Sequence, residues 1–124
     1  MTNDSLVEIK VERGLLRVIL SGDVTLVEAS TVKKMVTQAT ESSLRPQGIV
    51  LDLSGAGHIY SPALGRLLGL LALPLPLAVV ASPVHADLFG KLGISDVLNC
   101  CVTVADAFLV LGKGATNGAN TDGF

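Results

Sequence analysis

The sequence has few charged residues, no surplus of basic ones and almost no cysteine. Charged residues make up 16% of the 124 residues and hydrophobic residues 49%, a balance that excludes intrinsic disorder for most of the chain. The formal net charge of −2 provides no basic surface for nucleic acid or for an anionic membrane. A nucleic-acid-binding role is therefore disfavoured, and the length predicts one domain with a substantial buried core.

The cysteines and histidines do not form a pattern typical of a metal site or a disulfide. Cys100 and Cys101 are adjacent, and neighbouring cysteines do not form an ordinary unstrained disulfide. We expect them to be buried thiols that act as small hydrophobic side chains. Neither His58 nor His85 has an aspartate or a cysteine at ligand spacing, so we expect no metal, no cofactor and histidines that face solvent or a partner.

The start of the chain carries no signal-peptide pattern, so a cytoplasmic location is expected. Residues 67–84 carry no charge and are long enough to raise the alternative of a membrane span. Pro74, Pro76 and Pro83 would break such a helix repeatedly. A strand over Leu77–Ala81, reached through a proline-containing loop, places each proline where it is tolerated, so membrane insertion is not expected.

Hydrophobic periodicity predicts the first elements. Apolar and polar residues alternate over 7–11 and apolar residues recur at every second position over 16–20, which predicts an antiparallel β-hairpin. Thr25 and Glu28 follow at the spacing of a capping box, in which each side chain bonds the backbone amide of the other residue. An apolar stripe then predicts an amphipathic helix that runs to about Glu41.

The middle of the chain predicts a buried strand followed by a turn and a helix. The continuous apolar run Ile49–Leu51 is typical of a strand covered on both faces in a parallel or mixed sheet. The glycine-containing segment 52–57 is expected to end that strand in a turn, where Asp52 accepts backbone hydrogen bonds. Ser61 is then predicted to cap a helix whose first residue is Pro62.

The last elements follow the same alternation of strands and helices. Ser82 and Pro83 predict another helix start, and a short strand is expected over Val97–Val102. The buried side of the helix after Pro83 is expected to comprise Val84, Leu88, Phe89 and Leu92. Thr103 and Asp106 are then predicted to cap the last helix.

The chain beyond Leu111 is rich in glycine and asparagine and has no hydrophobic period. We therefore expect one domain over residues 1–111 and a flexible tail over 112–124. The order of elements predicts an α/β fold with α+β character, in which a mixed sheet of about five strands carries about four helices.

Five segments of this pattern are similar to motifs of one known family. They are Leu20-Ser-Gly-Asp-Val-Thr, Ile49-Val-Leu-Asp-Leu-Ser, Leu64-Gly-Arg-Leu-Leu, the segment Leu88–Leu98 that contains Lys91-Leu-Gly-Ile, and Thr103-Val-Ala-Asp-Ala-Phe. In this order they resemble STAS domains of the anti-sigma-factor antagonist family, from Val7 to Leu111. The resemblance implies the STAS fold and a cytoplasmic bacterial binding domain that is not an enzyme.

The resemblance also implies the partners. Such a domain binds a serine-kinase anti-sigma factor and thereby frees a sigma factor for transcription. The kinase stops this binding by phosphorylating a serine or threonine at the start of the central helix, and a PP2C-type phosphatase reverses the modification. A phosphate adds about −1.5 to −2 charges where the partner must dock. No nucleic acid or cofactor is implied, and a monomer or weak homodimer is expected.

The chain departs from the family pattern at this phosphorylation site. Tyr60 stands where the family has aspartate, and Ser61 stands at the first serine. Pro62 replaces the usual phosphate acceptor, and Ala63 replaces a glycine. Because proline has no hydroxyl group, Ser61 becomes the candidate phosphorylation site, with helix capping as its alternative role.

We expect the partner surface to combine the turn His58–Ser61, the exposed side of a helix over Pro62–Leu71, and the segment Asp23–Thr25. The residues assigned to it are Asp23, Thr25, His58, Tyr60, Ser61, Pro62, Ala63, Gly65, Arg66 and Gly69. No catalytic residue is expected, because Ser61 has no base and no orienting acid near it in the sequence. Two alternatives stay open: a phosphorylation-blind STAS scaffold or subunit of a signalling or lipid-transport assembly, and a ligand sensor with a pocket at the helix start.

Overall fold

A computed structural model describes residues 5–42 and 45–120, with side chains as far as Gly112. The elements are β1 (Leu6–Glu12), β2 (Leu15–Val24), α1 (Leu26–Thr40), β3 (Ile49–Ile59), α2 (Ser61–Leu68), the 3₁₀ helix η1 (Gly69–Ala72), β4 (Leu77–Val80), α3 (Pro83–Lys91), β5 (Cys100–Cys101) and α4 (Val104–Asn120). The sheet has the order β1-β2-β3-β4-β5; β1 is antiparallel to β2 and every other pair is parallel. The predicted mixed five-stranded α/β fold with an N-terminal hairpin is confirmed.

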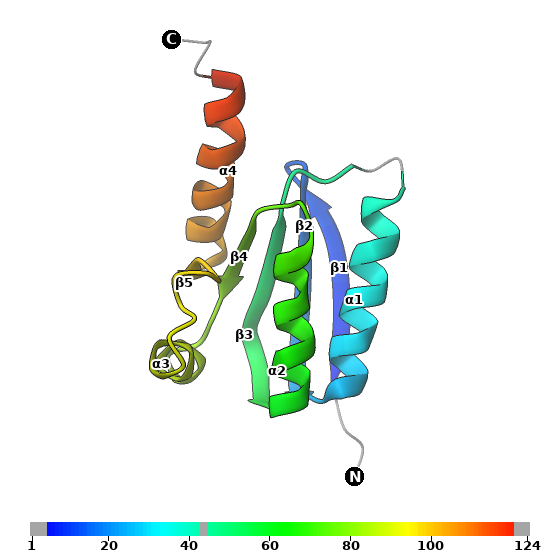
Figure 1. The fold of residues 1–124 in the computed structure, drawn as a ribbon, viewed down its shortest axis with the longest axis vertical. Helices are drawn as coiled ribbons and strands as arrows, with labels where there is room; N and C mark the ends of the chain where they lie inside the picture. The colour runs from blue at the N-terminus through cyan, green and yellow to red at the C-terminus, as the bar shows by residue number, and fades with distance from the viewer. Residues whose placement is uncertain (1–4, 43–44, 121–124) are drawn as a thin grey trace.

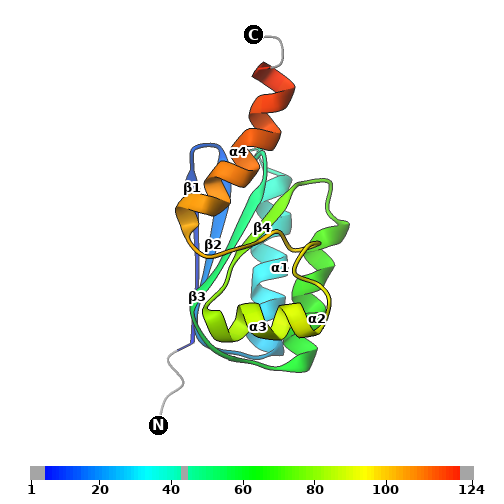
Figure 2. The same ribbon diagram turned by 90° about the vertical axis from the view of Figure 1, so that its left-hand side faces the viewer.

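Helices cover both faces of the sheet. Helices α1 and α2 lie side by side over one face, whereas α4 lies against the opposite face beside β4 (Figures 1 and 2). The larger core fills the space under α1 and α2 and includes Phe89 from α3. The smaller core joins Val50 and Val80 of the sheet to Ala107 and Leu111 of α4. Strand β3 is therefore buried on both faces over its first half, as its continuous apolar run predicts.

The first two connections follow local turn and cap chemistry. Arg13 and Gly14 form a two-residue turn between β1 and β2, with φ values of 55° and 77°. Positive φ at both positions is what a tight hairpin turn requires. The capping box is confirmed at the start of α1, where the Thr25 amide donates to Glu28 Oε1 at 2.8 Å and the Val27 amide donates to Thr25 Oγ1. The side-chain hydrogen bond from Thr25 holds the pKa of Glu28 below its usual range.

The predicted turn over 52–57 is wrong, because β3 continues through this segment to Ile59. The backbone of β2 supplies the pairing: Ser21 lies opposite Gly55, and Gly22 lies opposite Ala56. The parallel register shifts on either side of these pairs, so the glycines form an irregular stretch of strand. Asp52 does accept the backbone amide of Ser54 at 3.0 Å, as predicted, but within the strand.

Two predictions for the C-terminal half also need correction. The strand expected over Val97–Val102 is confined to Cys100–Cys101, because the amides of Leu98 and Cys100 turn back to Ile94 and Ser95. Helix α3 buries Phe89 as expected but places His85 beside it, which leaves Val84, Leu88 and Leu92 exposed. Ser82 and Thr103 do accept amide hydrogen bonds at the predicted helix starts.

The last helix is longer than predicted, and the two cysteines are free. Helix α4 extends to Asn120, beyond the predicted boundary at Leu111. The flexibility of residues 112–124 stays a prediction, and residues 121–124 lie outside the described part. Both cysteines are free and half-buried, and burial raises the pKa of each thiol. Across the described ranges, we find no helix with the length and apolar character that crossing a bilayer requires.

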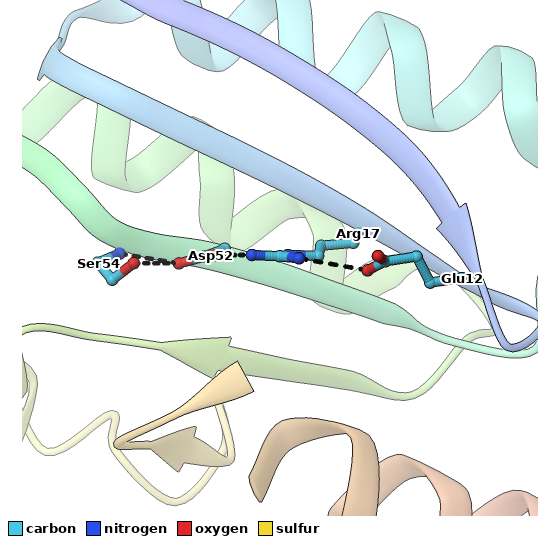
Figure 3. A network of polar contacts seen from close by, with 4 residues as sticks. All are labelled: Glu12, Arg17, Asp52 and Ser54. Carbon is cyan, nitrogen blue, oxygen red and sulfur yellow. Dashed lines mark hydrogen bonds and ion pairs between the residues drawn. The ribbon is translucent and has the colours of Figure 1, made fainter. Parts of the chain in front are cut away.

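A chain of polar contacts crosses the sheet on the face that carries α4. Arg17 of β2 donates to Asp52 Oδ2 at 2.9 Å and to Glu12 Oε1 at 3.3 Å, and the Ser54 hydroxyl donates to Asp52 Oδ1 at 2.6 Å (Figure 3). Burial alone would raise the pKa of Asp52, but the hydrogen bonds from Ser54 and Arg17 outweigh it and hold that pKa below its usual range. The contacts link the first three strands through their side chains.

We predict that Asp52→Asn destabilises the fold by about 2 kcal/mol, because it leaves a partly buried guanidinium without its main partner. In the wild type, the stabilising contribution of Asp52 is complete above its unfolded pKa of about 4 and is lost as the pH falls through the lower folded-state pKa. Urea unfolding from neutral to acid pH measures both effects, and the variant should lose less stability on acidification.

Glu12→Gln is the matched control, since Glu12 contacts the same guanidinium at a longer distance from a more exposed position. It should cost less than Asp52→Asn. Equal losses from both substitutions would contradict the assignment of Asp52 as the dominant partner of Arg17.

Candidate functional site

The chain leaves β3 and enters α2 through an exposed corner, defined here as His58, Tyr60, Ser61 and Pro62. All four residues are exposed, whereas Ile59 between them points into the core. The His58 and Tyr60 rings meet edge to face with centroids 4.4 Å apart. The Tyr60 amide donates to the Val24 carbonyl at 3.1 Å, which holds the corner beside the end of β2. The corner therefore presents aromatic and hydroxyl groups on a fixed backbone.

Asp23 fixes this backbone from β2. Its Oδ1 atom accepts the His58 amide at 3.0 Å, across a separation of 35 residues. Gly57 lies so close that an added Cβ would stand 2.5 Å from the same oxygen. Glycine is therefore needed at position 57 for Asp23 to reach the amide. The sequence assigned Asp23 to the partner surface, which stays a prediction; the structure shows that its side chain positions the corner.

His85 fixes the same backbone from α3. It is buried, and its Nε2 atom lies 2.7 Å from the Gly57 carbonyl oxygen, while Nδ1 lies 3.1 Å from Ser82 Oγ. A carbonyl oxygen can only accept a hydrogen bond, so Nε2 carries the proton. The expectation that this histidine faces solvent or a partner is wrong. Its position one helical turn before Phe89, on the buried face of α3, was the available signal.

The start of α2 differs from the predicted cap by one residue. Tyr60 is the N-cap, because its carbonyl accepts the first helical hydrogen bond from Leu64 at 2.9 Å. Ser61 is therefore the first helical residue and Pro62 the second, and the predicted role of Ser61 as the cap is wrong. No hydrogen bond within the described part of the chain occupies the Ser61 hydroxyl. This side chain is free for another molecule.

The other assigned residues are spread over α2 and its neighbours. Ala63 is 0% exposed and belongs to the core, so its side chain cannot contact a partner. Gly65 is exposed, with nothing within 4 Å of an added Cβ. Arg66 donates from Nη1 to Ser30 Oγ at 3.2 Å, and an added Cβ at Gly69 would lie 3.9 Å from Lys33 Nζ. Arg66 and Gly69 therefore face the first half of α1.

The surface extends onto α1 in a way that the sequence did not indicate. Leu26 and Val27, in the first turn of α1, are exposed, and Val27 is 70% exposed. They follow Thr25, whose side chain is held in the capping box and is only partly exposed. Both lie outside the apolar stripe of α1, and this was the signal that could have placed them on the surface. The candidate site therefore combines the corner with the first turns of α1 and α2.

Among the described residues, no group of three or more histidines, cysteines and acids could hold a metal ion. An open hollow of about 270 Å³ lies elsewhere, at the loop before β5 and at α4. Its lining residues are Ser95, Asp96, Asn99, Cys100, Cys101 and Val110. This hollow includes no residue of the corner, so it does not support a ligand sensor there.

Comparison with known proteins identifies the fold. No protein-family model matches the chain, and no curated protein sequence matches it either. A solved structure of an anti-sigma factor antagonist from Mycobacterium paratuberculosis matches with a TM-score of 0.75 and 21% sequence identity. The match covers 90% of this chain and 97% of that one. The likeness confirms the resemblance to the STAS domain at the level of the fold.

We predict that Gly57→Ala destabilises the protein by about 1 kcal/mol, because the added methyl group pushes Asp23 away from the His58 amide. The exposed helical position Gly65 provides the control. There, Gly65→Ala should stabilise the protein by about 0.5 to 1 kcal/mol through helix propensity. Chemical denaturation of both variants measures the pair. Stabilisation by alanine at both positions would show that the contact between Gly57 and Asp23 does not constrain the corner.

Proposed function

We propose that this chain is an anti-sigma-factor antagonist, a binding module that frees a sigma factor by occupying its anti-sigma factor. The observation that carries the proposal is the exposed corner at the start of α2, held rigidly on a fold that matches an anti-sigma factor antagonist. A rigid exposed surface binds with little loss of conformational entropy. The proposed partner is an anti-sigma factor of the serine-kinase type, and a PP2C-type phosphatase would restore binding after phosphorylation.

The composition of the surface supports a protein partner. It presents the exposed Tyr60 ring and, on the first turn of α1, the exposed side chains of Leu26 and Val27. Arg66 adds a cation on the neighbouring helix, hydrogen-bonded to Ser30. Aromatic and arginine side chains are enriched among residues that dominate binding energy at protein interfaces.

Ser61 is the proposed phosphorylation site. It is exposed at the first position of α2, where the amide groups of the helix N-terminus tolerate an added anion. A phosphate there would place about two negative charges in the middle of the corner. It would therefore prevent docking without unfolding the helix.

A second candidate is a phosphorylation-blind STAS scaffold or subunit that binds constitutively. The observation that favours it is Pro62, which occupies the usual acceptor position and has no hydroxyl group. In this alternative the corner still binds a protein, but no kinase controls it. The two candidates therefore share a surface and differ in the effect of charge at Ser61.

We predict that Ser61→Asp weakens binding to a candidate kinase-type anti-sigma factor by at least about tenfold, because it places a carboxylate within the interface. Ser61→Ala should stay close to the wild type, since the hydroxyl has no partner within the described part of the chain. Calorimetry with the purified partner measures both variants. Incubation with the same partner and ATP, followed by mass spectrometry, should place the phosphate on Ser61.

Three outcomes separate the candidates. A strong effect of the aspartate together with phosphate on Ser61 supports the switch. Binding that neither substitution changes, with no phosphate on the protein, supports the constitutive scaffold. Phosphate found only at other residues removes Ser61 from the switch.

A further inference from the structure

Strand β1 forms one edge of the sheet, and among the described residues no strand pairs with its outer side. It is the first strand in the sheet order and pairs only with β2 within the described part of the chain (Figures 1 and 2). Two of its apolar side chains, Leu6 and Val11, are 55% and 48% exposed. An open edge of this kind is a template for pairing with another strand. The sequence of β1 determines which strand fits.

The hairpin register shows which backbone groups point outward. Glu12 and Leu15 flank the two-residue turn, and such flanking residues form a hydrogen-bonded pair. Because pairs of the two kinds alternate, Lys10 and Glu8 also direct their amides and carbonyls toward β2. Val7, Ile9 and Val11 therefore direct theirs toward the free edge.

The strand is complementary to itself when it runs antiparallel. A two-fold axis at Ile9 places Val7 opposite Val11 of the second copy, and these are the residues whose backbone groups point outward. The same axis places Glu8 opposite Lys10 and Lys10 opposite Glu8, as pairs without direct backbone hydrogen bonds, in which side chains approach most closely. In this one register the outward backbone groups form hydrogen bonds between the two copies, and opposite charges face each other.

Two of the three charged residues of β1, Glu8 and Lys10, have no ion-pair partner in the part of the chain that the structure describes. Lys10 lies opposite Arg17 of β2, and like charges at this position are unfavourable. A carboxylate from a second copy would offset that repulsion.

We infer that the chain forms a symmetric homodimer through β1, with the two-fold axis at Ile9 and reciprocal contacts between Glu8 and Lys10. The two five-stranded sheets then join into one continuous sheet. The inference rests on the edge strand alone and does not depend on the proposed function of the corner.

Charge reversal tests the inference. Lys10→Glu and Glu8→Lys each place like charges opposite one another at both symmetry-related contacts. Each variant should weaken self-association by about tenfold relative to the wild type. An equimolar mixture of the two variants brings opposite charges together again, so it should associate as the wild type does. Sedimentation velocity over a concentration series measures all four samples, and circular dichroism confirms that each variant is folded.

A backbone variant provides an independent test. Val11→Pro removes an amide that points to the free edge from a residue whose side chain is 48% exposed, so it should abolish the dimer and leave the fold intact. Lys10→Pro removes an amide that pairs with β2, so it should destabilise the fold itself. This contrast would not arise from a dimer formed through another surface.

The outcomes decide the inference. Loss of association in both single charge variants and its recovery in the mixture support it. A wild type that stays monomeric over the whole concentration series overturns it, as does a dimer that Lys10→Glu and Val11→Pro leave unchanged.

Discussion

Two hydrogen bonds to consecutive residues fix the backbone where β3 ends, and the exposed corner depends on them. His85 of α3 donates to the Gly57 carbonyl, and the His58 amide donates to Asp23 of β2. Asp23 lies on β2, on one side of β3, whereas His85 lies on α3, which follows β4 on the other side. A movement of the end of β3 toward either side would therefore break one of the two hydrogen bonds. Exposed glycine-rich backbone would otherwise lose considerable conformational entropy on binding. Here that entropy is lost when the protein folds.

The sequence predicted the elements whose evidence is local. Alternation identified the β-hairpin, and the spacing of Thr25 and Glu28 identified the start of α1. It failed where a distant partner decides the structure. Residues 54–57 are poor strand formers taken alone, yet β2 pairs with them through an irregular register that no local pattern encodes. The role of His85 was missed for the same reason, because its acceptor, the Gly57 carbonyl, is 28 residues away.

The edge strand and the corner are connected through Asp23. Its side chain holds the His58 amide, and its backbone carbonyl accepts the Ser5 hydroxyl at 2.6 Å, immediately before β1. Strand β1 is also joined to the interior of the sheet by Glu12 and Arg17, which contacts Asp52 of β3. A partner strand that orders β1 would therefore stabilise contacts at both ends of the hairpin. The two proposed surfaces are distinct, but Asp23 takes part in the contacts that position both of them.

The two serine-proline pairs of the chain show how the corner differs from an ordinary helix start. At α3, Ser82 is the cap and accepts the His85 amide, which occupies its hydroxyl oxygen. At α2, the helix cap lies one residue earlier than the serine. The Tyr60 amide still donates to the Val24 carbonyl of β2, and the Tyr60 carbonyl begins the helix. Pro62 then lacks the amide that a helix start leaves unpaired, and its ring fixes φ without help from a cap. The shift therefore leaves Ser61 exposed on a helix start that its hydroxyl is not needed to stabilise, which a site open to modification requires.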